Sequence, residues 1–465
     1  MGEYPRINLV TMVRLGLFQA GLGMMSVLML GILNRVMISE LAIPPLVAAG
    51  VIAMHQLVAP ARVWFGQMSD AHPVGGLHRT GYVWLGAGVF ALLAWGVVQI
   101  TWQVAAQMAL GWTGVTWAWV ALLGLGFALY GLAVSASSTP FAALLVDISD
   151  EDNRSQLVGV VWSLLMVGII AGAIIGSGLL KQVELAAAEA AKAVVRASVN
   201  RLFTLVPLGV VGLAVVATAG IEARFSRYRL RSQVVEREDQ ITLGRALRVL
   251  TASPQTGLFF SFLLCMTLGL FMQEPVLEPY GGEVFGMPIA ATTLLNAYWA
   301  MGTLLGLGVT GFWVVPRLGK RPTTILGCGL AALGFLGIML AGWVGQVWLF
   351  TLMVFAFGVA AGVTTTGALT LMLDLTLAET AGTFIGAWGL AQALARALAT
   401  LGGGGLLELG SRWFGAETFW AYVPVFGTQI VLLLTAATLL RTVDVKAFTH
   451  STRAALGEVL AEELE

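Results

Sequence analysis

The chain has 465 residues, of which 58% are hydrophobic and only 11% are charged, and its mean hydropathy is +0.87. A soluble domain carries about 25% charged residues, so the composition excludes an ordinary soluble protein and indicates a membrane protein. The formal net charge is zero, which excludes the strongly basic surface of a nucleic-acid-binding protein. Both cysteines, Cys265 and Cys328, lie in apolar runs, so we expect them to serve in packing rather than in a disulfide.

Apolar segments recur along the whole chain, and each is close to the roughly 20 residues that a helix needs to cross a bilayer. They fall at 14–38, 44–66, 80–100, 117–144, 157–180, 202–221, 257–272, 289–315, 323–343, 346–373, 381–407 and 420–440. Because lipid cannot satisfy an open backbone, these segments must be helical. The sequence therefore predicts an all-α polytopic membrane protein with twelve transmembrane helices.

A polar stretch, 222–253, divides the twelve segments into two sets of six and contains seven arginines. By the positive-inside rule this stretch is cytoplasmic, and an even number of spans on each side then places both termini in the cytoplasm as well. We expect an N-terminal half at 1–221, the basic linker at 222–253, a C-terminal half at 254–441 and a tail at 442–465. The Ala-rich segment 181–201 is predicted to be an amphipathic helix on the outer surface.

The two halves resemble each other. LLVD at 144–147 and LMLD at 371–374 are each followed by a polar turn and an apolar helix. A parallel repeat of six helices, with a site near the midplane between the halves, resembles the major facilitator superfamily. The loop after the second segment also resembles the signature of that superfamily, through Gly66, Asp70 and Arg79. We expect Gly66 to permit close helix approach and Asp70 to meet Arg79 as a gate at the cytoplasmic face; the alternative is a solvated loop.

Longer stretches resemble one family more closely. They are RLGLFQAGLG (14–23), LNRVMISEL (33–41), APARVWFGQMSD (59–70), EPYGGEVFG (278–286), LMLDLT (371–376) and GAWGLAQALAR (386–396). Together they are similar to the PucC/LhaA, or bacteriochlorophyll delivery, family, and the stretch around HQLVAPARVWFGQMSDAHP (55–73) is more similar to the cyanobacterial members. The resemblance implies an assembly factor that handles chlorophyll, with carotenoid as a further pigment. It also implies light-harvesting or photosystem subunits and small pigment-binding membrane proteins as partners, in a thylakoid or a bacterial inner or intracytoplasmic membrane.

Polar side chains within membrane helices are costly and are therefore functional candidates. The charged ones are Arg14, Arg35, Glu40, Arg62, Asp147, Asp374 and Arg396, and the candidate pigment or cavity groups are His55, Gln56, Gln19, Gln392 and Glu274. Arg14 could also simply snorkel to the surface, and Arg35 with Glu40 could form an ion pair at a helix end. His55 is the only histidine predicted at mid-membrane depth. A neutral imidazole can ligate the magnesium of chlorophyll; the alternative is a histidine bonded to a neighbouring helix.

No phosphate-binding loop, metal-ligand spacing or nucleophile motif occurs in the sequence. We therefore expect no enzyme and no metal other than the magnesium of a pigment. The two function classes that stay open are a pigment-binding assembly factor and a transporter that moves a small solute by alternating access.

Overall fold

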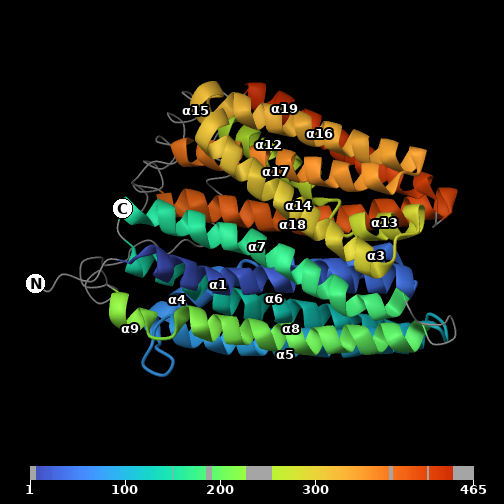
Figure 1. Cartoon of the computed structure of the whole chain (residues 1–465), viewed down its shortest axis with the longest axis horizontal. Coiled ribbons are helices and arrows are strands. Elements are labelled where there is room, and N and C mark those ends of the chain that lie inside the picture. Colours follow the sequence, from blue (N-terminus) through green and yellow to red (C-terminus); the bar gives the residue numbers. More distant parts are fainter. Residues whose placement is uncertain are drawn as a thin grey trace, which may run out of the picture. The chain divides into compact units, whose positions relative to one another are not determined.

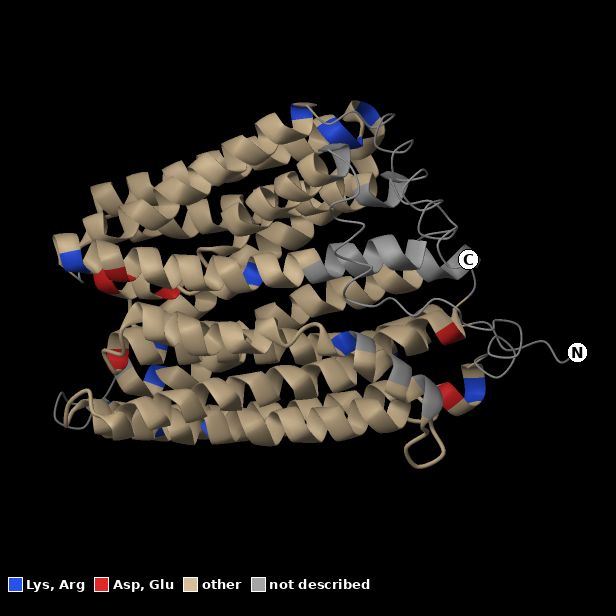
Figure 2. Ribbon diagram, turned by 180° about the vertical axis from the view of Figure 1, so that it is seen from behind, with Lys and Arg blue, Asp and Glu red and all other residues tan. Residues whose placement is uncertain are grey.

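The computed structural model describes residues 7–149, 151–184, 191–226, 254–375, 381–415 and 418–442. Within these ranges every regular element is a helix, apart from one isolated β-bridge between Val74 and Leu77. The predicted all-α architecture is therefore confirmed. Most of the described charged residues lie near helix ends, and the middles of the helices are almost free of charge (Figure 2), as the bilayer core requires.

The described residues contain nine helices that are long and apolar enough to cross a membrane. They are Leu9–Glu40, Thr80–Met108, Gly114–Ile148, Gln156–Val183, Lys192–Phe225, Ile289–Leu318, Lys320–Val344, Val347–Leu371 and Phe419–Thr442. Two shorter apolar helices, Pro45–Leu57 and Gly257–Phe271, occupy the second and seventh predicted segments. The helix Ala381–Phe414 lies at the eleventh predicted segment. Helix thus covers all or part of each predicted segment, while the number that cross the bilayer stays a prediction.

The chain divides into two compact units. Unit 1 contains Met1–Arg237 and Leu277–Ala300, and unit 2 contains Glu238–Val276 and Met301–Glu465. The described helices of unit 1 are α1 (Leu9–Ser26), η1 (Val27–Ile32), α2 (Leu33–Arg35), η2 (Val36–Glu40), α3 (Pro45–Leu57), α4 (Ala61–Ala71), α5 (Thr80–Met108), α6 (Gly114–Ile148), α7 (Glu151–Glu184), α8 (Ala191–Thr218), α9 (Ile221–Phe225) and α13 (Leu277–Phe285). Those of unit 2 are α12 (Pro254–Phe271), η3 (Thr310–Val314), α15 (Val315–Leu318), α16 (Lys320–Val344), α17 (Val347–Leu375), α18 (Ala381–Phe414) and α19 (Phe419–Thr442), and α14 (Ile289–Val309) belongs to both units.

The units differ from the predicted halves in one respect. The whole of α13 and the first part of α14 pack with the N-terminal helices, although their sequence follows the predicted linker. Most of that linker lies outside the described residues.

In unit 1, α1 and α7 lie side by side (Figure 1). A Cβ on Gly168 of α7 would collide with the backbone of Ala20, and one on Gly23 of α1 would collide with the backbone of Leu165. Small residues at such positions let two backbones approach closely, so that van der Waals contact holds the helices together in the membrane. Larger side chains on this face would force the two helices apart.

The second predicted segment is not one helix, and the expectation of a continuous span at 44–66 is wrong. The helix α3 ends at Leu57 and α4 begins at Ala61. Pro60 lies at the break, where it has no N–H to donate and its ring would clash with the carbonyl of Gln56 in a continuous helix. Instead Ala59 donates its N–H to Gln56 at 3.0 Å in a tight turn.

The predicted surface helix at 181–201 is also wrong within the described residues. The residues up to Glu184 continue α7, and those from Ala191 begin α8. The basic residues there therefore extend two long helices. An Ala-rich, mildly polar sequence can serve equally well as the end of a membrane helix.

Candidate functional site

The first membrane helix changes its pitch on both sides of Arg35. Two π-helical stretches, η1 and η2, flank the short segment α2. Hydrogen bonds in a π turn run from residue i to residue i+5, and such turns within helices are frequent at functional sites. Here they place Arg35 in the protein interior, where only 6% of the residue is exposed.

Helix α13 presents a carboxylate and a glycine to this arginine. Glu278 is 3% exposed, and its Oε1 accepts a hydrogen bond of 2.6 Å from Nδ2 of Asn296. A Cβ on Gly31 would collide with the Glu278 carboxylate, and one on Gly282 would collide with the Arg35 guanidinium. The two glycines therefore leave the space in which these charged side chains fit between the helix backbones.

Arg35, Glu40, Glu278 and Asn296 together form what we call the Arg35 cluster. Nη2 of Arg35 lies 3.7 Å from Oε1 of Glu40, as their sequence spacing predicts. Within the described part of the chain, Nε and Nη1 of Arg35 and Oε2 of Glu278 have no hydrogen-bond partner. Burial raises the pKa of Glu278 to about 7, while the hydrogen bond from Asn296 and the charge of Arg35 oppose the rise. The cluster thus holds a carboxyl group that can gain or lose a proton near neutral pH.

A second polar group surrounds Arg79 at the other end of unit 1. Arg79 is 2% exposed; its Nε donates to Oδ2 of Asp147 at 2.9 Å, and its Nη1 donates to Oγ of Ser69 at 2.6 Å. A buried guanidinium requires this compensation, because leaving one partner of a buried pair alone is strongly destabilising. The pair joins the loop before α5 to the end of α6.

Glu222 of α9 closes the N-terminus of α5. Its carboxylate accepts hydrogen bonds from the backbone N–H groups of His78 at 2.7 Å, Arg79 at 3.1 Å and Thr80 at 2.7 Å. These groups lie at the positive end of a helix, where N–H groups lack partners within the helix. We expected Glu222 to belong to the linker, and no local pattern in the sequence indicated this long-range contact.

Of the three predicted gate residues, Arg79 is buried as described above, and the side chain of Asp70 lies outside the described ones. The Asp70–Arg79 contact therefore stays a prediction, and Asp147 is a partner of Arg79 that we did not expect. Among the described residues, a Cβ on Gly66 would meet only Cγ2 of Thr139, at an ordinary 3.6 Å. This contact alone does not require a glycine at position 66, and a role of Gly66 in close helix approach stays a prediction.

His55 is half-buried on α3. Its Nδ1 lies 2.5 Å from the carbonyl oxygen of Ile52; since a carbonyl only accepts, this contact requires the proton on Nδ1, and in the neutral ring the lone pair is then on Nε2. The same stretch of α3 packs tightly on α6, because a Cβ on Gly131 would collide with the His55 backbone. Gln56 beside it is 9% exposed, and Gln19 of α1 is half-buried.

Two of the predicted membrane arginines have other surroundings than we expected. Arg14 donates from Nε to the carbonyl of Val216 at 2.6 Å and from Nη2 to that of Ala219 at 2.5 Å. It thereby satisfies carbonyls at the end of α8, where a positive charge is favourable. Arg62 is exposed rather than buried. It follows the break at Pro60, near the beginning of α4.

Two of the predicted polar residues of unit 2, Arg396 of α18 and Glu274, lie in contact. Nη2 of Arg396 donates to Oε1 of Glu274 at 2.7 Å, and Cζ of Arg396 lies 4.0 Å from the ring centroid of Phe271. Gln392 is half-buried one turn earlier on α18. The side chain of Asp374 lies outside the described ones. Arg396 and Glu274 are thus paired with each other in the structure.

None of the described side chains form a group of three or more His, Cys, Asp or Glu residues suited to a metal ion. A pigment magnesium needs only one protein ligand, and a histidine with its lone pair on Nε2 is a chemically suitable one. The neutral ring of His55, with Nδ1 donating to Ile52, has that form, so the residues present are compatible with such a pigment.

The family model for the PUCC protein matches residues 32–448. The chain belongs to this family. It is 29% identical to Protein PucC of Rhodobacter capsulatus over 442 residues, covering 92% of this chain and 91% of that one. It is likewise 29% identical to a protein of the same organism named bacteriochlorophyll synthase 44.5 kDa chain, over 91% of this chain and 93% of that one.

Solved structures of transporters share the fold. The nucleoside transporter NupG matches with a TM-score of 0.69 at 11% identity, covering 92% of this chain and 98% of that one. A bacterial homologue of the iron transporter ferroportin, in its inward-facing state, matches with a TM-score of 0.65 at 13% identity over 94% and 99% of the two chains. The chain therefore has the same fold as these transporters, as the predicted major facilitator architecture requires.

Proposed function

We propose that the protein binds chlorophyll and serves in the assembly of light-harvesting or photosystem complexes, on a fold shared with transporters. The observation that carries the proposal is the family match over residues 32–448. A relative named for bacteriochlorophyll supports the choice of pigment. A role in handing pigment to nascent subunits, with carotenoid as a further ligand, belongs to the same proposal.

His55 is the residue that we propose as the magnesium ligand. The hydrogen bond from its Nδ1 to Ile52 fixes the ring orientation, and contacts of this kind on the remote nitrogen are usual for ligating histidines. Bound pigment would supply the macrocycle and its magnesium, while the protein supplies one axial ligand and apolar walls. Gln56, Gln19, Gln392 and Glu274 stay secondary candidates.

The proposal includes the location and partners. We place the protein in a thylakoid or a bacterial inner or intracytoplasmic membrane, with both termini in the cytoplasm. Its partners are light-harvesting or photosystem subunits and small pigment-binding membrane proteins. We also propose that it has no enzymatic activity of its own, because the sequence offers no catalytic motif.

A deletion strain tests this proposal. We expect assembled chlorophyll–protein complexes to fall while chlorophyll synthesis continues, and the purified protein in mild detergent to carry chlorophyll absorbance. Complementation with the intact gene should restore the complexes. Loss of chlorophyll synthesis itself would contradict the proposal.

The second candidate function is transport of a small solute by alternating access, and the fold shared with transporters favours it. The Arg35 and Arg79 groups at the two ends of unit 1 could then serve as gates. Normal complexes in the deletion strain, together with loss of uptake of a soluble metabolite, would support this candidate over the first.

A further inference from the structure

A groove lies between α16 and α19 in unit 2. It has a volume of about 890 Å³, and both helices are among those suited to cross a membrane. Its lining consists of Arg321, Pro322, Ile325, Leu326, Gly329, Leu330, Leu333, Leu434 and Arg441. Leu333 and Leu434 are 61% and 50% exposed, so the groove opens on the surface rather than toward a protein core.

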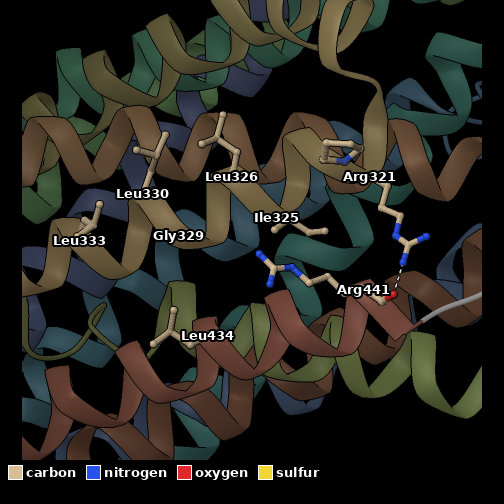
Figure 3. Close-up of a pocket in the computed structure, with 9 residues that line it drawn as sticks. Arg321, Ile325, Leu326, Gly329, Leu330, Leu333, Leu434 and Arg441 are labelled. Atoms are coloured by element: carbon tan, nitrogen blue, oxygen red, sulfur yellow. Dashed lines mark hydrogen bonds between the residues drawn. The ribbon is translucent and has the colours of Figure 1, made fainter.

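The groove is apolar along its length and cationic at one end. Arg321 and Arg441 lie together at that end, and the leucines extend away from them along α16 and α19 (Figure 3). Arg321 donates from Nη2 to the carbonyl oxygen of Arg441, which holds the two residues close. None of the residues that line the groove is acidic.

Two guanidinium groups thus line one groove, and the described lining offers no acidic side chain to balance their charge. Arg321 uses one N–H group on the carbonyl at the end of α19, and an arginine has five such donors. No described residue accepts a hydrogen bond from the Arg441 guanidinium. The charge at this end of the groove is therefore complementary to an anion.

The apolar part has the length of a lipid tail region. From Arg321 to Leu333 the helix rises about 18 Å, at 1.5 Å per residue, and one leaflet of the hydrocarbon core is about 15 Å thick. Gly329 lies within this stretch, and a Cβ there would meet nothing within 4 Å. This glycine therefore deepens the groove without being required for helix packing.

We propose that this groove binds an anionic phospholipid, with its head group on Arg321 and Arg441 and its acyl chains along Gly329, Leu330 and Leu434. Basic pockets between membrane helices on the cytoplasmic side bind such head groups. The positive-inside pattern of the segment PRLGKR, 316–321, predicts that this end is cytoplasmic. The site is independent of the proposed handling of pigment.

The test uses the full chain, purified in mild detergent, delipidated and titrated with phosphatidylglycerol or phosphatidylcholine while native mass spectrometry counts bound lipid. The wild type should bind phosphatidylglycerol more tightly than phosphatidylcholine. Arg321→Gln should weaken it about fivefold and the double variant with Arg441→Gln about thirtyfold, abolishing the preference over phosphatidylcholine. Gly329→Leu should fill the groove and weaken binding of both lipids.

Two matched controls separate the groove from general effects. Arg412→Gln removes an arginine that is 70% exposed and paired with Glu408, and Gly88→Leu adds the same side chain at a position on α5 where a Cβ meets nothing within 4 Å. Both should bind phosphatidylglycerol as the wild type does. Equal binding of the two lipids by the wild type, or unchanged binding by the double arginine variant, would overturn the proposal. Displacement of phosphatidylglycerol by chlorophyllide would reassign the groove to pigment.

Discussion

Replacing Glu278 by glutamine should make the stability of the protein less sensitive to pH. In the folded protein, burial raises the pKa of Glu278 from 4.5 to about 7, so between these values the folded state holds a proton that the unfolded state releases. The folding free energy therefore becomes less favourable as the pH rises from about 4.5 to about 7. Above pH 7 the cost of the buried carboxylate is fully present, at about 3 kcal/mol.

The variant Glu278→Gln keeps an oxygen that can accept the hydrogen bond from Asn296 but carries no charge. It should therefore exceed the wild type in stability by up to about 3 kcal/mol at pH 8, and the difference should be nearly gone at pH 5. Thermal unfolding in detergent micelles between pH 5 and 8 measures this. The control Glu40→Gln removes a charge from the same cluster and leaves Glu278 in place, so it should keep the pH dependence of the wild type. If the difference between wild type and Glu278→Gln is the same at pH 5 and pH 8, the reasoning is refuted.

Three further predictions concern other parts of the molecule. Asp147→Asn should cost about 3–5 kcal/mol in thermal unfolding, because Arg79 loses its buried counter-charge; a loss below about 1 kcal/mol would show that the pair contributes little. His55→Gln should retain co-purified chlorophyll at least in part, and His55→Leu should lose it while the protein still inserts; pigment unchanged by leucine would rule out ligation. Gly168→Leu should destabilise unit 1 by about 1–3 kcal/mol or more through overpacking. Gly178→Leu on the same helix should be neutral, because a Cβ there meets nothing within 4 Å, and equal effects of the two changes would contradict the packing described for α1 and α7.

Hydropathy predicted where the helices lie, because the bilayer selects long apolar segments regardless of their partners. It did not predict the break at Pro60, since a proline within a membrane helix is often tolerated; Pro140, for example, lies within the continuous helix α6. Hydropathy also averages over a window and therefore does not show a change of pitch such as that around Arg35.

The partners of the polar residues depend on contacts between distant parts of the chain. Arg79 was recognised as important from its loop, but its contact with Asp147 joins residues 68 positions apart. Glu278 stands in the sequence only as the first residue of the stretch EPYGGEVFG (278–286), and its hydrogen bond to Asn296 depends on how α13 folds back on α14. One sequence contains no signal for such pairs, whereas the local pairing of Arg35 with Glu40 followed from their spacing.

The break at Pro60 also bears on how the chain enters the membrane during synthesis. The helix α3 has 13 residues, which rise about 20 Å, less than the roughly 30 Å of a hydrocarbon core. Because α3 is shorter than the hydrocarbon core, the turn that follows it and Arg62 would lie within the lipid. Transfer of this segment alone from the insertion machinery into the bilayer would therefore be unfavourable. The first long helix, Leu9–Glu40, emerges from the ribosome immediately before it. We therefore expect the two to enter the bilayer together as a hairpin, which makes the connecting residues 41–44 a part of the insertion signal and not only a loop.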